Sequence, residues 1–427
     1  MYRFIPRYSQ EELLRLQENG LRWTLLHAFA RSPQYRAKFE EAGLDPCAVR
    51  GLEDLRHIPL TTTDDLRFGY PLPLLSVPES DVVRVHASSG TTGKRKILAY
   101  TRKDVDTFAL QMARCFEMAG LSPQDRVQIA VGYGLWTAGA GFQLGCEQFG
   151  AMTVPVGAGN LEIHLQMLAD LGSTCLCSTA SMALLMGEEV VRHGLADKIN
   201  LRTVIFGAEG HNVKMRKTFE RLLGIEQSFD IGGMTEMYGP GTSIECLAHN
   251  GLHYWGDLFI IEILDPVTLQ PVSPGQIGEM VVTSLSKEAS PLIRYRTRDL
   301  SRLLPGDCPC GCAMPRHDHI LGRSDEMITF RGVNIYPGQI AEILQDFVEL
   351  GSEYHIHLSR EGGRDFMRLQ VERAPGAGSD TDDALAARLV RSLHSRVLVS
   401  ASVEITDPAS LPRSFGKSRR VTDARLA

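Results

Sequence analysis

Apolar residues near the start of the chain recur at close to the helical period. The apolar positions of this stretch are Leu13, Leu14, Leu16, Leu21, Leu25 and Phe29. Residues three or four positions apart lie on one face of a helix. The pattern therefore predicts amphipathic helix over residues 9–43, and no residue type in it indicates chemistry.

Beyond residue 126 the pattern changes to short apolar runs separated by longer amphipathic segments. The runs cover residues 127–131, 152–156, 174–177 and 204–206, and the amphipathic segments cover 161–171, 181–193 and 213–223. Strands that alternate with helices usually form a parallel sheet covered by helices. The pattern predicts an α/β fold for this part of the chain.

From about residue 252 the apolar runs lie closer together, without long helical segments between them. Runs at 254–263, 278–283 and 292–296 predict a β-rich subdomain, and residues 327–427 form a separate α+β pattern. We expect a large N-terminal domain, residues 1–324, and a small C-terminal domain, residues 325–427. No Gly/Ser-rich linker joins them, so the hinge is expected to be short.

The composition is typical of a soluble globular protein. Of 427 residues, 43% are hydrophobic and 22% are charged, and the formal net charge of -6 gives no electrostatic basis for nucleic acid or membrane partners. The uncharged residues 127–146 could span a bilayer, but their five glycines favour a buried strand, a turn and a core helix. With no visible signal peptide, we expect a cytoplasmic protein whose nine cysteines are thiols or metal ligands.

One glycine- and hydroxyl-rich segment has the composition of an anion-binding loop. Glycine lets backbone N–H groups converge, hydroxyls add donors and a lysine adds charge. Apolar residues 82–85 and 97–100 flank the segment and predict a β-hairpin with the loop at its tip. A solvated surface turn is the alternative, and phosphate binding is the better interpretation. The loop residues are Ser88, Ser89, Gly90, Thr91, Thr92, Gly93 and Lys94.

A second segment pairs a hydroxyl with a carboxylate after two glycines. Thr235 and Glu236 follow Gly232 and Gly233 in the run that begins at Asp230. The hydroxyl suits a phosphate and the carboxylate suits Mg²⁺, which prefers hard oxygen ligands. Without other motifs, a helix start with Thr and Glu in its first turn explains the same residues about equally well.

Cysteine and histidine residues form a separate constellation. Cys308 and Cys310 lie in a dense C-x-C turn, and Cys246 and His253 lie upstream. Two thiolates, a third cysteine and an imidazole can complete a tetrahedral Zn²⁺ site with no open position, which is the pattern of a structural metal. Unliganded core thiols are the alternative. Cys312 and His249 are the reserve ligands.

These motifs resemble those of the adenylate-forming superfamily, and 86–94 is most similar to the phenylacetate–CoA ligase family. The resemblance extends over nearly the whole chain. It implies that residues 88–94 grip the β- and γ-phosphates of ATP, that Glu236 holds Mg²⁺ and that Thr235 contacts phosphate. Gly232 stands where that family has an aromatic residue. Further matching segments are 206–209, 230–236, 294–299, 322–328, 331–337 and 412–420.

The same resemblance assigns the remaining site residues. Gly207, Ala208 and Glu209 correspond to the adenine-side loop, and Asp230 belongs to the nucleotide-binding set. Asp299 would hold the ribose hydroxyls, since a carboxylate can accept two hydrogen bonds from a diol. The last set comprises Arg323 near the ribose, Asp325 at the hinge, Gly332 facing the thioester half-reaction and Lys417 as the catalytic lysine.

The acyl pocket is implied to lie along residues 132–137. Trp136 presents a flat apolar ring there, which favours an aryl or arylalkyl acid, and the missing aromatic side chain at Gly232 would widen the pocket. The expected lining residues are Tyr133, Gly134, Trp136, Thr137, Gly232 and Gly233.

The implied activity is ATP-dependent activation of a carboxylic acid, followed by transfer to coenzyme A. ATP, Mg²⁺ and coenzyme A are the expected cofactors, with a structural Zn²⁺. One alternative is an enzyme that passes the acyl group to a carrier protein or an amine. Another is a nucleotide-binding module without turnover, against which the series Lys94, Glu236, Asp299 and Lys417 argues. A homodimer is one assembly considered, and the oligomeric state is left open.

Overall fold

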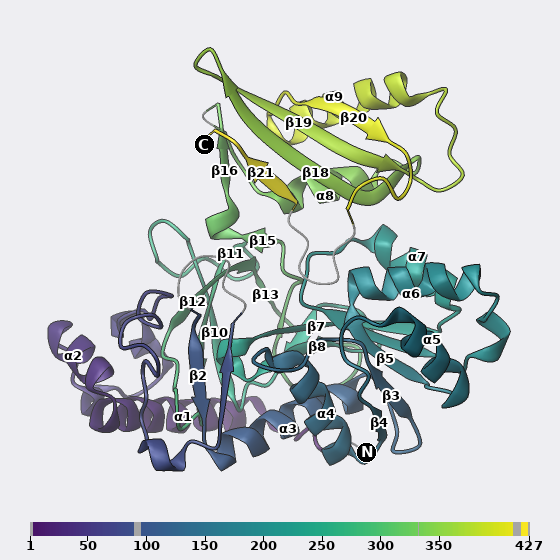
Figure 1. The fold of residues 1–427 in the computed structure, drawn as a ribbon. Helices are drawn as coiled ribbons and strands as arrows, with labels where there is room; N and C mark the ends of the chain where they lie inside the picture. The colour runs from purple at the N-terminus through teal and green to yellow at the C-terminus, as the bar shows by residue number, and fades with distance from the viewer. Residues whose placement is uncertain (1–2, 89–94, 332, 413–419, 426–427) are drawn as a thin grey trace. The chain divides into compact units, whose positions relative to one another are not determined.

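The computed structural model describes residues 3–88, 95–331, 333–412 and 420–425 (Figure 1). They form two compact units. The first comprises Met1–Ser178, Lys198–Ala208 and Glu226–His319, and the second comprises Thr179–Asp197, Glu209–Ile225 and Ile320–Ala427.

The chain begins with two helices, not one. Helix α1 (Gln10–Arg31) starts at Ser9, whose side chain accepts from the Glu12 N–H while the Glu12 carboxylate accepts from the Ser9 N–H. Helix α2 (Pro33–Glu41) starts at Ser32, which has an extended backbone. Helix over 9–43 was therefore predicted correctly in type, but Pro33 cannot continue the preceding helix and instead opens the next one.

A nine-stranded sheet forms the centre of the first unit, with strand order β13-β14-β9-β8-β7-β6-β5-β3-β4. The pairs β3/β4, β3/β5 and β6/β7 are parallel, as the alternation of apolar runs and helices predicted, whereas β7/β8 and β8/β9 are antiparallel. The strands are β3 (Arg126–Ile129), β4 (Met152–Val154), β5 (Cys175–Thr179), β6 (Thr203–Gly207), β7 (Gln227–Met234), β8 (Gly239–Glu245), β9 (Leu252–Tyr254), β13 (Leu303–Leu304) and β14 (Arg316–His317).

The uncharged stretch 127–146 contains strand β3, a turn and helix α4 (Thr137–Phe149), as expected. Its glycines let α4 approach helix α3 (Arg102–Met118): a Cβ at Gly145 would lie 2.2 Å from Cβ of Met112. Among the described residues, no helix is both long enough and apolar enough to cross a membrane.

The first unit also contains α5 (Leu161–Asp170) and the short helices η1 (Pro46–Ala48), η2 (Leu52–His57), η3 (Glu79–Asp81) and η5 (Thr235–Met237).

The expected β-rich region is an antiparallel arrangement of β10 (Phe259–Leu264), β11 (Gly278–Ser284) and β12 (Tyr295–Ser301). The expected hairpin is also confirmed. Strand β1 (Arg84–Ala87) pairs antiparallel with β2 (Ile97–Tyr100), so that Ala87 faces Ile97 across the base of the loop.

The second unit contains the predicted α+β pattern. A four-stranded sheet, order β20-β19-β18-β21, packs with its helices around Ile340, Ile356, Leu369 and Leu389. Its elements are β15 (Gly322–Arg323), β16 (Ile328–Phe330), β17 (Val333–Ile335), α8 (Pro337–Gln345), β18 (Leu350–Glu361), β19 (Arg364–Arg373), α9 (Asp382–Val397), β20 (Ser402–Thr406), β21 (Val421–Asp423), α6 (Ala180–Arg192), α7 (Val213–Leu223) and the short helices η4 (Ala196–Lys198) and η6 (Ser324–Glu326).

Candidate active site

The β1–β2 hairpin presents the predicted phosphate loop. The Ser88 N–H donates to the Lys96 carbonyl at 3.1 Å, which closes the hairpin below the loop. The Ser88 hydroxyl is buried and has no hydrogen-bond partner among the described residues, so a donor is available at the entrance to the loop. Ser89, Gly90, Thr91, Thr92, Gly93 and Lys94 lie outside the described residues, and their phosphate role stays a prediction.

The Glu236 carboxylate lies where strand β7 passes into the short helix η5. Its side chain is 6% exposed, and its Oε1 atom accepts from the Lys96 ammonium and, at 3.1 Å, from the Tyr295 hydroxyl. Lys96 Nζ also lies 3.3 Å from the Tyr295 hydroxyl oxygen. Two residues far apart in sequence, Lys96 just before β2 and Tyr295 at the start of β12, therefore supply partners that the sequence motifs did not indicate.

The charge on Glu236 follows from these contacts. Burial alone would raise the pKa of Glu236, but the Lys96 ammonium and the Tyr295 hydroxyl bring the pKa below its ordinary value. The carboxylate is consequently ionised at neutral pH. A buried anionic carboxylate beside the phosphate loop has the hard-oxygen chemistry that Mg²⁺ requires, so this residue fits the predicted role.

A second lysine contacts the backbone of the same segment. Lys287 is fully buried and donates to the Glu236 backbone carbonyl at 2.7 Å. Its ammonium lies 4.9 Å from the ring centroid of Tyr100 and 5.1 Å from that of Tyr238. Burial lowers the pKa of Lys287 to about 8, partly opposed by the negative charge of Asp104. Nothing in the sequence distinguishes Lys287, which stands beside Glu288 in the short run between β11 and β12.

The expected acyl-pocket segment joins the hairpin to η5. The Ala87 N–H donates to the Leu135 carbonyl at 2.8 Å, which attaches β1 to the turn before α4. A Cβ at Gly239, the second residue after η5, would lie 2.4 Å from Oγ1 of Thr137. The phosphate loop's hairpin, the Glu236 segment and the predicted acyl pocket therefore meet at one place.

Within that segment, each predicted lining residue has a defined position. Gly134 has φ +90°, which favours glycine, and Trp136 is the N-cap of α4 without a side-chain capping bond. Thr137 is buried, and its hydroxyl has no hydrogen-bond partner among the described residues. Tyr133 is 37% exposed, so a substrate can reach its ring.

The two predicted pocket glycines lie against neighbouring strands. A Cβ at Gly232 would lie 2.4 Å from Oγ of Ser243, which itself hydrogen-bonds Nε2 of His317 at 2.8 Å. A Cβ at Gly233 would lie 2.2 Å from the Gly239 carbonyl oxygen. Any side chain added at Gly232 must therefore displace Ser243, a flexible side chain, before it can narrow a pocket.

On the predicted nucleotide side, the first unit supplies Gly207, Ala208, Asp230 and Asp299. Strand β6 ends at Gly207, where a Cβ would lie 2.3 Å from the Ile231 carbonyl oxygen, and Ala208 follows with φ +70°. Asp299 lies in β12, where its N–H donates to the Thr297 hydroxyl at 3.0 Å. Gly207 and Ala208 thus lie at the carboxyl end of a strand, where α/β proteins bind ligands, whereas Asp230 lies within β7 and Asp299 lies in a strand of a different sheet.

Asp230 is paired with a histidine that sequence analysis missed. Nδ1 of His319 lies 3.0 Å from Asp230, and Nε2 lies 3.4 Å from the buried Glu245. Burial alone would lower the pKa of His319, but the two carboxylates raise it above its ordinary value. The ring can thus carry a positive charge beside Asp230 near neutral pH.

In the second unit, Arg323 and Asp325 form a bidentate ion pair. Their Nε–Oδ1 distance is 2.9 Å and their Nη2–Oδ2 distance is 3.0 Å. Glu209 accepts from the Ser181 N–H at 2.5 Å, and burial raises its pKa. Gly332 and Lys417 lie outside the described residues, so their roles stay predictions.

The predicted metal ligands come together. The candidate ligand atoms of Cys246, His253, Cys308 and Cys310 all lie within 4.8 Å of one another. Nδ1 of His253 bonds the Met314 carbonyl at 2.8 Å, which leaves Nε2 directed at Cys310 Sγ, 3.4 Å away. This second hydrogen bond fixes the ring in the orientation that a metal-bound histidine needs.

The two reserve ligands are not in this group. His249 instead contacts Glu245 at 3.3 Å and Gln227 at 3.2 Å. The Cys312 N–H donates to Cys310 Sγ at 3.4 Å, so Cys312 supports the turn through its backbone.

Burial lowers the pKa of His253 to about 4, and the ring is neutral, as a metal ligand must be.

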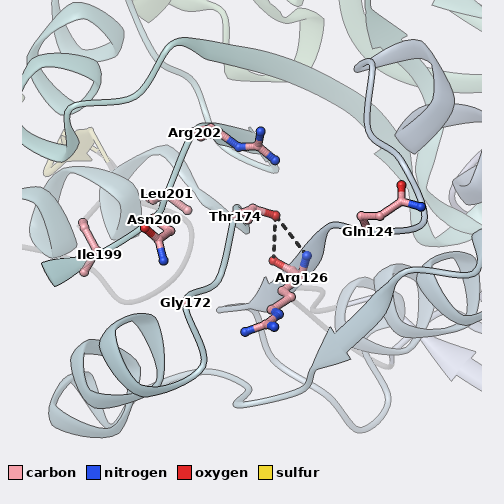
Figure 2. Close-up of a pocket in the computed structure, with 8 residues that line it drawn as sticks. All are labelled: Gln124, Arg126, Gly172, Thr174, Ile199, Asn200, Leu201 and Arg202. Carbon is pink, nitrogen blue, oxygen red and sulfur yellow. Dashed lines mark hydrogen bonds between the residues drawn. The ribbon is translucent and has the colours of Figure 1, made fainter.

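An open hollow lies at a different edge of the sheet (Figure 2). Arg126, Thr174 and Arg202 line it at or just before the starts of β3, β5 and β6, and the Arg126 N–H donates to the Thr174 hydroxyl at 2.9 Å. Arg202 is paired with Asp125 at 2.8 Å. Ligands of α/β sheets bind at the opposite, carboxyl ends of the strands, so this hollow is not the candidate site.

Comparisons with known proteins agree with this geometry. The profile of the AMP-binding enzyme family matches residues 30–286, and that of the AMP-binding enzyme C-terminal domain matches residues 332–425. The chain is 42% identical to the phenylacetate-coenzyme A ligase of Escherichia coli (strain K12), covering 99% of this chain and 97% of that protein. It is 39% identical to the enzyme of the same name from Thermus thermophilus, covering 99% and 98%.

Solved structures of acyl-CoA ligases are also similar. A 2-hydroxyisobutyryl-CoA ligase in its postadenylation state, bound to an acyl-AMP, superposes with a TM-score of 0.89 at 28% identity, covering 99% of this chain and 92% of that one. The same ligase with 2-HIB-AMP and CoA gives a TM-score of 0.70 at 27% identity, covering 100% and 95%.

Proposed function

The chain belongs to the AMP-binding enzyme family and has the mixed α/β adenylate-forming fold, and from this premise we propose that it is an aryl or arylalkyl acid–CoA ligase. It would convert a carboxylic acid and ATP to an acyl-adenylate and pyrophosphate, and then form the acyl-CoA thioester with release of AMP. The observation that carries the proposal is the meeting of the β1–β2 hairpin, the buried anionic Glu236 and the segment 132–137.

In the first half-reaction the substrate carboxylate attacks the α-phosphorus of ATP. The chain's contribution is to position the two reactants and to stabilise the charge that develops between them. Residues 88–94 hold the β- and γ-phosphates, Thr235 contacts phosphate and Lys417 neutralises charge between the carboxylate and the α-phosphate. Bound Mg²⁺ supplies charge neutralisation on the phosphates, and Glu236 is the residue that holds it.

The nucleoside is held by a second set of residues. Gly207, Ala208 and Glu209 form the adenine-side loop, Asp230 belongs to the nucleotide-binding set, and Asp299 and Arg323 bind the ribose. Asp299 can accept two hydrogen bonds from the ribose diol.

For the second half-reaction we propose that residues 325–427 act as a mobile domain. A turn about Asp325 removes Lys417 from the adenylate and brings the loop at Gly332 toward it, which opens a route for the CoA thiol. Domain reorganisation between half-reactions is an established catalytic device. The Arg323–Asp325 ion pair lies at the boundary proposed between residues 1–324 and 325–427.

The acid proposed is aromatic. Trp136 and Tyr133 offer rings along the acyl segment, and ring pairs contribute about 0.5–1.5 kcal/mol beyond the burial of area. Relatives that are about 40% identical to this chain carry the name phenylacetate-coenzyme A ligase. The pocket proposed comprises Tyr133, Gly134, Trp136, Thr137, Gly232 and Gly233.

We also propose a structural Zn²⁺ at Cys246, His253, Cys308 and Cys310. Supporting this are the convergence of four ligand atoms and the orientation of His253. Four protein ligands leave no position for water, which is the structural and not the catalytic arrangement. We further propose a cytoplasmic enzyme, with a homodimer as one assembly and with neither nucleic acid nor membrane among its partners.

Pyrophosphate release, measured with a panel of carboxylic acids with and without CoA, tests the proposed function. Acid-dependent release of pyrophosphate, with acyl-CoA formed only when CoA is present, is the expected result. Release without acyl-CoA would indicate transfer to a carrier protein or an amine. Nucleotide binding without any release would indicate a binding module and contradict the proposal.

A further inference from the structure

The three cysteines proposed as zinc ligands come from two separate segments of the first unit. Cys246 directly follows β8, whereas Cys308 and Cys310 lie in the connection between β13 and β14. The Sγ atoms of Cys246 and Cys308 are 3.5 Å apart, although the two residues are 62 positions apart in the sequence. A disulfide has an S–S distance of about 2.05 Å, so a movement of about 1.5 Å brings the two sulfurs to bonding distance.

This group of thiols lies beside an open hollow of about 300 Å³. Cys246 and Cys310 are among the residues that line the hollow, and Cys310 is itself partly exposed. A water molecule occupies roughly 30 Å³ in the liquid, so the hollow is large enough for a small hydroperoxide. These thiols are therefore within reach of a small oxidant, whereas Cys115 and Cys177 are buried in the core.

The end of β8 connects these thiols to the predicted nucleotide site. The last residue of β8 is Glu245, whose carboxylate is 1% exposed and accepts from the Asp230 N–H at 2.9 Å. The same carboxylate lies 3.4 Å from His319 and 3.3 Å from His249. Because Cys246 is the next residue, a displacement there is transmitted to the end of the strand that carries Glu245. The backbone of Asp230 then loses part of its support.

We propose that Cys246 and Cys308 are a redox-sensitive pair: a hydroperoxide converts them to a disulfide, the zinc ion is released, and nucleotide binding beside Asp230 weakens. This inference rests on the zinc site and the nucleotide site of the proposed function. Once two thiolates are lost to the disulfide, only Cys310 and His253 remain for the metal, and a structural zinc site needs four ligands. Oxidation thus lowers the affinity of the protein for ATP.

The chemical step balances in atoms and electrons. A cysteine that coordinates zinc is already a thiolate. The Cys246 thiolate attacks one oxygen of the hydroperoxide, the O–O bond breaks, and a sulfenic acid forms while alkoxide leaves, or hydroxide when the oxidant is hydrogen peroxide. The Cys308 thiolate then attacks the Cys246 sulfur, the S–S bond forms and hydroxide leaves. The two sulfurs supply the two electrons that reduce the peroxide, and both leaving anions take protons from water.

Oxidation of the full-length, zinc-loaded protein tests the pair. Hydrogen peroxide is added to protein that has been kept reduced, and zinc release is followed with a chromophoric zinc indicator. The protein is then digested, and mass spectrometry identifies the linked peptides. We expect one zinc ion to be released for each disulfide between Cys246 and Cys308. Cys47→Ser, which removes an exposed thiol outside this group, should leave both readouts unchanged.

The second measurement is calorimetric binding of a non-hydrolysable ATP analogue. Its affinity is measured before oxidation, after oxidation, and after treatment with dithiothreitol and zinc. Affinity should fall several-fold on oxidation and return to its starting value after the treatment, because thiol–disulfide exchange restores the two thiols. Irreversible oxidation to a sulfinic acid would not be repaired by dithiothreitol, so a permanent loss of affinity would contradict the disulfide.

Two further outcomes would overturn the inference. Zinc release without a linkage between Cys246 and Cys308 would show that they are not the pair. A linkage that leaves the analogue affinity unchanged would show that the pair does not act on the nucleotide site.

Failure of the proposed function gives different results. If the untreated protein does not bind the analogue, the nucleotide site is wrong, and the effect on ATP affinity fails with it. If the purified protein holds no zinc, the zinc site is wrong, and mass spectrometry still shows whether the two cysteines form the disulfide. The test uses the native pair, so it does not depend on the folding of a variant at either cysteine.

Discussion

Lys287 donates to the backbone carbonyl of Glu236 at 2.7 Å while its own side chain is fully buried. The carbonyl is held by one lysine and the carboxylate of the same residue by another, Lys96. Glu236 is thus fixed at both ends, and its carboxylate direction is set before any ligand binds. Such support from a surrounding layer is what gives a catalytic carboxylate its precision.

The burial of Lys287 predicts a pH dependence of stability. The pKa of Lys287 falls from 10.5 in the unfolded chain to about 8 in the folded protein. Between these values the unfolded state binds more protons, so the free energy of unfolding contributed by this group rises with pH. Below about pH 8 the folded protein carries the full cost of burying the charge.

We therefore expect wild type to gain stability relative to Lys287→Met as the pH rises from about 8 to about 9.5, by on the order of 2 kcal/mol. Urea denaturation of both proteins at several pH values measures the difference. Lys103→Met, which removes an exposed lysine, should show no such trend. A difference that stays constant across this range would mean that folding does not lower the pKa of Lys287, so that the lysine is protonated in both states.

Lys417→Ala should abolish adenylate formation while leaving thioester formation from supplied acyl-adenylate largely intact. The reason is that a lysine between the carboxylate and the α-phosphate stabilises only the first transition state. Single-turnover assays of each half-reaction measure the two effects. If both half-reactions fell equally, Lys417 would have another role. Lys103→Ala is a suitable control for the loss of a lysine elsewhere.

The sequence predicted those parts of the site that depend on local pattern. The hairpin followed from apolar residues on both sides of the phosphate loop, and the four metal ligands followed from residue type, although Cys246 and Cys308 lie 62 positions apart. The partners of Glu236 could not be found in this way, because a lysine and a tyrosine that lie 140 and 59 positions from it have no special residue type that links them to one carboxylate. Only the folded chain brings the start of β2, η5 and the start of β12 close together, since β2 and β12 belong to different sheets.

The direction of a side chain also cannot be predicted from local pattern. That Gly232 widens the acyl pocket stays a prediction, and the structure adds that a Cβ there would lie 2.4 Å from Oγ of Ser243, which hydrogen-bonds His317. A sequence motif shows that an aromatic side chain is absent at this position. It does not show which neighbouring side chain lies where that aromatic ring would be. The helix break at Pro33 is another feature of this kind. Proline permits either a kink in one helix or the start of a new helix, and packing determines which of the two forms.

Purified protein should contain one Zn²⁺ per chain, bound by Cys246, His253, Cys308 and Cys310. Elemental analysis measures the zinc content. Cys308→Ser should lose most of the zinc, and its melting temperature should fall by several degrees, because structural zinc sites contribute folding energy. Cys47→Ser is the control, since Cys47 is an exposed thiol away from this group. If the purified protein contained no stoichiometric zinc and Cys308→Ser melted at the wild-type temperature, the three cysteines would be core thiols and His253 a core histidine without a metal.

The last prediction concerns the acid. If an aromatic substrate lies along residues 132–137, Trp136→Ala should reduce kcat/KM for aromatic acids about tenfold and for short aliphatic acids much less, since only the former lose ring contacts. Gly232→Tyr should narrow acceptance toward smaller acids, but its ring must first displace Ser243. Gly232→Tyr combined with Ser243→Gly removes that obstacle and should narrow acceptance more than Gly232→Tyr alone. A substrate screen decides the matter: straight-chain fatty acids exceeding every aromatic acid in kcat/KM would contradict the proposed acid class.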